Sequence, residues 1–201
     1  MRIGVFGGTF DPPHIGHQIL AADAAAQLAL DRVLWVLTPT PPHKLGRSIS
    51  ADRTRLRLVR AAAADNPLFE VSTIEFERPG PHFATDTLAA LTQRYPQAEL
   101  FYLMGGDSLR DLPTWHEPGL FLQRCAGVGV MRRPEAEIDM QHLEDVLPGV
   151  TAKVHFFHTP LVDISASDIR ARAAAGQPYR YLVPPAVFRW MERLQLYRTL
   201  S

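Results

Sequence analysis

The beginning of the chain constrains the fold most. A short apolar run, Arg2–Phe6, ends in Gly7 and Gly8, which indicates a buried strand followed by a glycine turn. Good helix formers, rich in Ala and Leu, then occupy about Ile15–Leu30, so we expect a helix there. The chain therefore begins with a strand, a tight turn and a helix.

The same alternation continues along the chain. Helical spacing is clear in Asp52–Ala64, where Leu56, Val59 and Ala63 are apolar. Further strands are predicted at Arg32–Leu37, Phe69–Ile74, Leu100–Met104, Ala126–Met131 and Val154–Phe157. Further helices are predicted at Thr85–Arg94, Ser165–Ala175 with Ser165 as N-cap, and Pro184–Leu194.

Strands that alternate with helices predict an α/β fold with a mostly parallel sheet flanked by helices. The chain has 201 residues, about the length of one domain, and shows no internal repeat or linker. We therefore expect a single domain over residues 1–201, with a C-terminal helical part at about 160–201.

Composition excludes several classes of function. Lys+Arg and Asp+Glu are both 21, which argues against a broad nucleic-acid-binding surface but leaves a local basic pocket possible. No stretch approaches the ~20 apolar residues of a membrane span, and the N-terminus lacks a signal-peptide apolar region. The single Cys125 has no metal-spacing partner and suits a buried strand in a reducing compartment. We expect a cytoplasmic protein, monomeric or a small homo-oligomer.

Two loops are the candidate ligand sites. Parallel sheets bind ligands beyond the carboxyl ends of their strands, where the strand order reverses. Gly7–His17 follows the first strand, and Gly105–Trp115 follows the Leu100–Met104 strand. Glycines at Gly7 and Gly8 let the backbone approach a ligand closely, so the N–H groups around Gly8, Thr9 and Phe10 are expected to face a phosphate.

His14 and His17 follow in the same loop, as the helix begins. Their i to i+3 spacing places both on one helix face, and Gly16 between them leaves room for a nucleotide. A helix N-terminus attracts anions, so two imidazoles there can donate hydrogen bonds to phosphate. One histidine could instead cap the helix while the other packs. A metal pair is disfavoured, since no third ligand is evident and the spacing is not HExxH.

The whole segment GGTFDPPHIGH resembles the signature of the HxGH nucleotidyltransferase superfamily and, more narrowly, of the bacterial nicotinate-nucleotide adenylyltransferases. Landmarks of this resemblance extend from Arg2 to Met191. It implies a Rossmann-like nucleotidyltransferase fold. Asp11 and Pro12-Pro13 are expected to shape the turn, and a direct catalytic role for Asp11 stays open.

Two further segments resemble the acceptor side of that family. PTPPHK ends in His43 and Lys44, and Lys44 could reach the triphosphate as a point charge. RPGPHFATDTL carries Ala84 and Thr85, expected to help hold the pyridine nucleotide, but it has His82-Phe83 where the family usually reads Ser-Tyr. Thr85 or Asp86 could equally cap the helix that follows.

GGDSLRDLPTWHE is the second strong resemblance. Gly105 allows an adenosine to approach, and Asp107 could bind ribose hydroxyls or help organise Mg²⁺. Trp115 could be a core residue, but the resemblance implies a platform that stacks on the pyridine ring. Backbone N–H groups near Trp115 and His116 could then hold the ring carboxylate and select nicotinic acid over nicotinamide.

ISASDIR resembles the second phosphate motif of the family. Ile164 precedes a helix start at which Ser165 and Ser167 offer hydroxyls and N–H groups. Arg170 lies one turn in and is expected to meet the β- and γ-phosphates. Read without the resemblance, the segment is a capped surface helix with a solvated arginine.

The resemblance implies attack by the phosphate of nicotinic acid mononucleotide on the α-phosphorus of ATP, giving nicotinic acid adenine dinucleotide and pyrophosphate. It implies Mg²⁺ held mainly by phosphates and water, with no metal-ligating side chains. The implied catalytic set is His14, His17, Lys44 and Arg170. The implied ATP contacts are Gly7, Gly8, Thr9, Phe10, His14, His17, Gly105, Asp107, Ile164, Ser165, Ser167 and Arg170. The implied acceptor contacts are Thr9, His43, Lys44, Ala84, Thr85, Trp115 and His116.

Three alternatives stay open. The first is another adenylyl- or cytidylyltransferase of the superfamily, such as one acting on phosphopantetheine, which the PPHK loop and Trp115 disfavour. The second is a nucleotide-binding regulatory module without catalysis. The third is a metal-dependent hydrolase, for which the sequence lacks clustered carboxylates.

Overall fold

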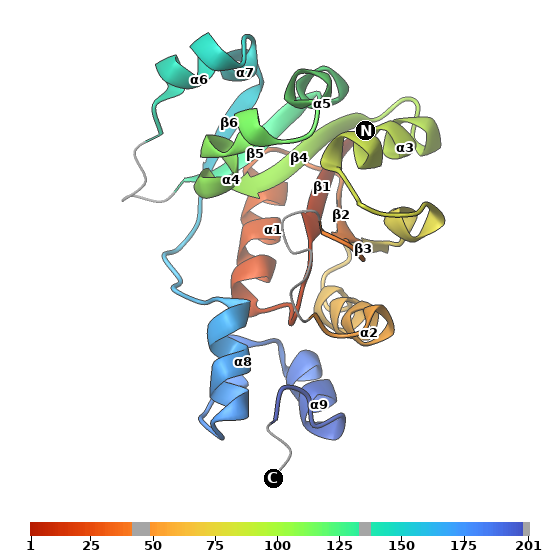
Figure 1. Ribbon diagram of the computed structural model, residues 1–201, viewed down its shortest axis with the longest axis vertical. Helices are drawn as coiled ribbons and strands as arrows, with labels where there is room; N and C mark the ends of the chain where they lie inside the picture. Colours follow the sequence, from red (N-terminus) through yellow and green to blue (C-terminus); the bar gives the residue numbers. More distant parts are fainter. Residues whose placement is uncertain (42–48, 133–137, 199–201) are drawn as a thin grey trace.

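A computed structural model describes residues 1–41, 49–132 and 138–198. Its centre is a sheet with strands in the order β3-β2-β1-β4-β5-β6, and every neighbouring pair is parallel. The strands are β1 (Arg2–Gly8), β2 (Arg32–Leu37), β3 (Phe69–Ser72), β4 (Glu99–Gly105), β5 (Gly127–Arg132) and β6 (Val154–His158). The predicted α/β fold with a parallel sheet is confirmed (Figure 1).

The helices that the sequence predicted are present with ends shifted by a few residues: α1 (Ile15–Gln27), α2 (Asp52–Ala63), α3 (Ala84–Arg94), α8 (Ala166–Ala174) and α9 (Pro185–Arg193). The sequence missed α4 (Gly106–Arg110), α5 (Pro118–Arg124), α6 (Met140–Val146) and α7 (Val150–Lys153). Short 3-10 turns, η2 (Ile74–Glu77), η3 (Leu112–Thr114) and η4 (Arg180–Leu182), complete the elements. None of the helices in the described ranges is long and apolar enough to cross a membrane.

The sheet is covered on both faces, and alternate residues of a strand enter different cores. In β2, Val33, Trp35 and Leu37 pack in one cluster with α1, α2, α8 and α9. Leu34 and Val36 pack in the other, with α3, α4 and α5. Continuous apolar strands such as β2 are what a parallel sheet buried on both faces requires.

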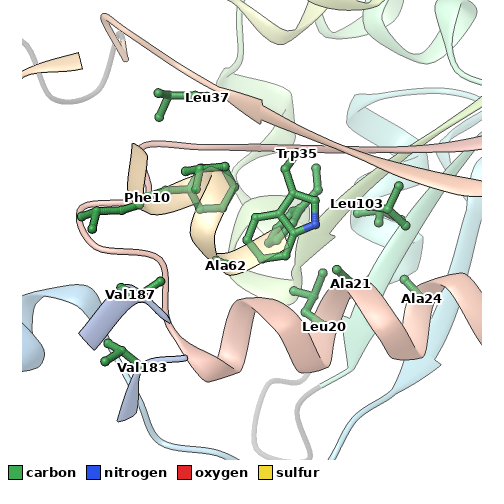
Figure 2. Packing of buried hydrophobic residues seen from close by; sticks show 14 of the residues in the cluster. Phe10, Leu20, Ala21, Ala24, Trp35, Leu37, Ala62, Leu103, Val183 and Val187 are labelled. Atoms are coloured by element: carbon green, nitrogen blue, oxygen red, sulfur yellow. The ribbon is translucent and has the colours of Figure 1, made fainter. Parts of the chain in front are cut away.

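The C-terminal part packs against the first loop of the chain. Val183 and Val187 are buried in the same cluster as Phe10 and Trp35, and Figure 2 shows them on the Phe10 side of that cluster. The helices α2 and α9 are in contact. In Figure 1, α8 and α9 lie together beyond the sheet, at the opposite end of the molecule from α6 and α7.

Candidate active site

A cavity of about 1050 Å³ lies where the strand order reverses, between the carboxyl ends of β1 and β4. The first loop, the start of α1, the start of α4, residues 159–163 and the start of α8 line it. It brings together nine of the sequence-predicted site residues: Thr9, His14, His17, Gly105, Asp107, Ile164, Ser165, Ser167 and Arg170.

The first loop turns as its glycines require. A Cβ on Gly8 would lie 2.9 Å from the ring of Phe10, so only glycine fits beside that ring. Phe10 itself has φ of 47°, in the left-handed region that bulky residues rarely adopt. Its ring lies 5.2 Å from the ring of Trp35, inside the core. Gly7, Gly8 and Phe10 therefore shape the loop and do not line the cavity.

His14 and His17 form a stacked pair at the start of α1. His14 is the N-cap residue and His17 is the third residue of the helix. Their ring centroids are 3.6 Å apart with an interplanar angle of 27°. The backbone N–H of His14 donates to Nδ1 of His17 at 3.0 Å. Since Nδ1 accepts this bond, the proton of a neutral His17 lies on Nε2, which is then a hydrogen-bond donor.

His14 is buried and uncharged at neutral pH. Its side chain is 8% exposed, and burial lowers the pKa of the imidazole from 6.5 to about 4. Its Nδ1 atom is buried without a hydrogen-bond partner in the protein. His14 is also one of the residues that line the cavity.

The start of α8 faces the same cavity. Ser165 is the N-cap, as predicted, and its Oγ accepts from the backbone N–H of Asp168 at 3.1 Å. Ser167 Oγ lies 2.9 Å from Ser165 Oγ. Arg170 donates from a guanidinium nitrogen to the backbone oxygen of Asp11 at 2.7 Å. This bond holds the arginine beside the first loop.

Asp11 joins three parts of the chain. Its side chain is buried, and one carboxylate oxygen accepts from the hydroxyl of Tyr197 at 2.7 Å. The other oxygen accepts from the backbone N–H of Ser50 at 3.1 Å. With Arg170 on its backbone oxygen, Asp11 fixes the turn and does not present a free carboxylate to the cavity. The sequence-based expectation that it shapes the turn therefore agrees with its contacts.

Arg55 is a residue that the sequence reasoning missed. It lies in α2 and is 1% exposed. Each of its guanidinium nitrogens donates at 2.5–3.0 Å, and its partners are the backbone oxygens of Thr9, Thr38, Pro39 and Ser50 and the carboxylate of Asp52. One buried cation thus fixes the loops after β1 and β2 relative to each other.

Of the predicted acceptor residues that the structure describes, Thr9 lines this cavity, and Ala84, Thr85, Trp115 and His116 are not among its lining residues. Ala84, Thr85 and Trp115 belong to the face of the sheet covered by α3 and α5. Trp115 packs edge-on against the rings of Tyr102 and Phe121, at 6.0 and 5.4 Å. His43 and Lys44 lie outside the described residues.

Two details of this face differ from the sequence-based expectation. The N-cap of α3 is Phe83, and the helix begins at Ala84, so neither Thr85 nor Asp86 caps it. Thr85 instead donates from its hydroxyl to the backbone oxygen of His116 at 2.9 Å. The predicted Gly105–Trp115 loop is wrong, because α4 and η3 occupy most of it.

The described residues contain no group of three or more His, Cys, Asp or Glu side chains that could hold a metal ion. In the cavity, Asp107 pairs with Arg110 at 3.0 Å.

Comparison with known proteins gives full-length relatives. Residues 5–172 match the family model described as Cytidylyltransferase-like. A protein of Thermomicrobium roseum named "Probable nicotinate-nucleotide adenylyltransferase" is 45% identical over 100% of this chain and 93% of its own length. Proteins with the same name are 43% identical in Exiguobacterium sibiricum, over 99% and 100%, and 42% identical in Roseiflexus castenholzii, over 98% and 98%.

Solved structures share the fold at low sequence identity. The nicotinic acid mononucleotide adenylyltransferase of Plasmodium falciparum complexed with NaAD has a TM-score of 0.80 and 16% identity, over 98% of this chain and 97% of that chain. The same protein complexed with APC gives a TM-score of 0.78 and 16% identity, over 98% and 96%.

Proposed function

This chain belongs to the cytidylyltransferase-like family and, within it, to the nicotinate-nucleotide adenylyltransferases, and we propose the reaction that its site performs. The enzyme transfers the adenylyl group of ATP to nicotinic acid mononucleotide, giving nicotinic acid adenine dinucleotide and pyrophosphate in NAD synthesis. The observation that carries the proposal is the stacked His14–His17 pair in a cavity that Arg170 also lines.

His17 is the donor to the transferring phosphoryl group. Its Nδ1 accepts from the backbone N–H of His14, so the proton of the neutral ring lies on Nε2, and the residue lines the cavity. A donor that is oriented before reaction stabilises charge on the transition state without reorganisation. His14, neutral and buried, supplies a second polar contact through its ring.

Arg170 and the start of α8 hold the leaving pyrophosphate. The N-cap Ser165 and the hydroxyl of Ser167 lie at the positive end of the helix. Arg170 is fixed by its bond to Asp11, so its charge stays in place while the phosphates bind. Lys44 completes the predicted charge set from the loop after β2.

No protein nucleophile takes part in this mechanism. The phosphate of the acceptor nucleotide is already an anion near neutral pH, since its second pKa is about 6. The work of the protein is to hold two anionic substrates in line and to stabilise the charge that is transferred. Mg²⁺, bound by the ATP phosphates and water, would supply further charge stabilisation.

The acceptor nucleotide binds at the carboxyl end of the sheet, on the face that α3 and α5 cover. Trp115 stacks on the pyridine ring, and backbone N–H groups near Trp115 and His116 bind the ring carboxylate. The bond from Thr85 to His116 supports this assignment, because it joins the start of α3 to the loop that would read the carboxylate. We place the enzyme in the cytoplasm, which suits its single buried cysteine.

The direct test is pyrophosphate release by the purified protein with ATP and Mg²⁺. Nicotinic acid mononucleotide, nicotinamide mononucleotide and phosphopantetheine are offered in parallel. We expect turnover mainly with the first, and turnover only with another acceptor would overturn the substrate assignment. His17→Ala should lower kcat about 100-fold while the fold stays intact, which circular dichroism checks.

A further inference from the structure

His82 makes a junction between two loops on the acceptor side. Its side chain is 6% exposed. Its backbone N–H donates to the backbone oxygen of Thr40 at 3.2 Å, and the backbone N–H of Thr40 donates to its ring Nδ1 at 3.3 Å. The ring Nε2 lies 3.2 Å from the backbone oxygen of Arg78. One histidine thus binds the loop after β2 to the segment that enters α3.

These contacts require a neutral ring. A backbone oxygen only accepts, so Nε2 carries the proton and donates to Arg78. Nδ1 must then be the unprotonated nitrogen, and this agrees with its role as acceptor from Thr40. A proton on Nδ1 would face the N–H of Thr40, and the bond between them would be lost.

The segment that His82 holds is also held from its other side. Arg55 donates to the backbone oxygens of Thr38 and Pro39, directly before Thr40. Arg55 and His82 therefore fix the three residues directly after β2, which are Thr38, Pro39 and Thr40. The same loop carries the predicted acceptor contacts His43 and Lys44 further along the sequence.

The charged groups beside the ring come from η2 and its C-terminal end. Glu75 is 4% exposed, accepts from the hydroxyl of Thr87, and interacts electrostatically with His82 and Arg78. Burial raises the pKa of the Glu75 carboxyl. Arg78 lies 3.6 Å from Asp86 of α3. No residue of Thr38–Pro41 is ionisable.

We propose that His82 is a positioning residue for the acceptor nucleotide: its neutral imidazole closes the loop after β2 onto the start of α3, and protonation opens this junction. The inference rests on the proposed function. It implies that the affinity for nicotinic acid mononucleotide falls as the pH is lowered, whereas the affinity for ATP does not fall with it.

The test compares the wild type with His82→Ala and His82→Asn. The amide oxygen of Asn occupies about the place of Nδ1 and can accept from Thr40, but it does not titrate. At pH 8 we expect His82→Ala to raise KM for nicotinic acid mononucleotide about 5- to 10-fold, and His82→Asn to change it less than about 2-fold. kcat and KM for ATP should stay within about 2-fold in both variants.

The pH arm uses a ratio so that ionisation of the substrate cancels. Between pH 8 and pH 5.5, the acceptor KM of the wild type divided by that of His82→Asn should rise about 5-fold, because a protonated ring cannot accept from the N–H of Thr40. A constant ratio would overturn the proposal. Equal increases of the two KM values in His82→Ala would also overturn it, because a general loss of structure would cause them. The same acceptor KM in His82→Asn as in His82→Ala would overturn it as well.

A second variant and a second readout separate this inference from the proposed function. A Cβ on Gly80 would lie 3.0 Å from Cε1 of His82 and from Cβ of Thr40, so Gly80→Ala should disturb the junction with the imidazole intact. Amide hydrogen exchange at Thr40, whose N–H donates to His82, should accelerate in His82→Ala and Gly80→Ala. Unchanged exchange in both variants would contradict the role of His82 in holding this segment. If the wild type were inactive with nicotinic acid mononucleotide, only the proposed function would be refuted.

Discussion

At the scale of single residues, His14 couples the active site to stability. Its pKa is about 4 when folded and near 6.5 when unfolded, so the unfolded chain binds more protons between these values. The stabilisation is complete above pH 6.5 and is lost as the pH falls toward 4. When the pH is lowered from 7.5 to 5, the free energy of unfolding should therefore fall by about 2 kcal/mol more in the wild type than in His14→Asn. Urea unfolding at the two pH values measures this.

The exposed His142 provides the matched control for this prediction. His142→Asn should follow the wild type at both pH values, because an exposed imidazole has no burial to lose. A wild type and His14→Asn that weaken equally in acid would show that the imidazole of His14 is solvated in the folded protein.

Arg55 is the second residue whose loss should be severe. Arg55→Met removes the donor to the backbone oxygens of Thr9, Thr38 and Pro39, and a buried acceptor that loses its donor costs about 1–3 kcal/mol. We expect a loss of at least about 3 kcal/mol in urea unfolding. The exposed Arg53→Met in the same helix should change stability by about 0.5 kcal/mol or less. A similarly small change for Arg55→Met would mean that water replaces its bonds.

The sequence contained a signal for Arg55 that was not used. Counted along α2, Arg55, Leu58, Val59 and Ala62 have the spacing of a single helix face, and all are buried. An arginine on an apolar face is a candidate for a buried, fully bonded cation. Its partners could not be predicted, because they are backbone oxygens from loops distant in the sequence. The hydrogen bond from the hydroxyl of Tyr197 to Asp11 could not be predicted for the same reason.

At the scale of elements, substitutions at the N-cap of α8 distinguish the effect of capping on stability from the effect of charge on ATP binding. Ser165→Asn and Ser165→Asp both keep a cap for the backbone N–H of Asp168, so each should stay within about 0.5 kcal/mol of the wild type in unfolding free energy. Asp adds a negative charge where phosphates are expected to bind. Ser165→Asp should therefore raise KM for ATP about 10-fold or more, and Ser165→Asn should not.

Ser165→Ala completes this series. It removes the cap and should cost about 1 kcal/mol, with a smaller change in KM for ATP than Ser165→Asp. Equal KM values for Ser165→Asp and Ser165→Asn would show that the phosphates lie away from the start of α8.

The elements that the sequence predicted are those with a strong pattern. β2 is an uninterrupted apolar run, and its predicted ends, Arg32 and Leu37, are those observed. The missed elements are short: α4 has 5 residues and α7 has 4, less than the windows in which helical periodicity is visible. The cavity residues followed from motifs, whereas the packing of Trp115 on Tyr102 and Phe121 depends on contacts between distant segments.

At the scale of the whole molecule, the sequence predicts one domain, and this remains to be tested. Its tryptophans report on separate regions: Trp35 in the sheet, Trp190 on α9, and Trp115 on the opposite face. In variants that keep one tryptophan each, the fluorescence midpoint in urea should equal the circular-dichroism midpoint of the same variant. An earlier midpoint for Trp190 alone would show that the C-terminal helices unfold as a separate unit.

The contacts of Arg55 also bear on how readily a site like this can change its substrate. Apart from Asp52, the partners of Arg55 are main-chain oxygens, and every residue type supplies a main-chain oxygen. The side chains at Thr9, Thr38 and Ser50 can therefore be exchanged while the guanidinium keeps its bonds. Natural divergence can therefore change these side chains while the backbone of the site is kept. A combinatorial library at the same positions would test whether directed evolution can reach new acceptor substrates in this way.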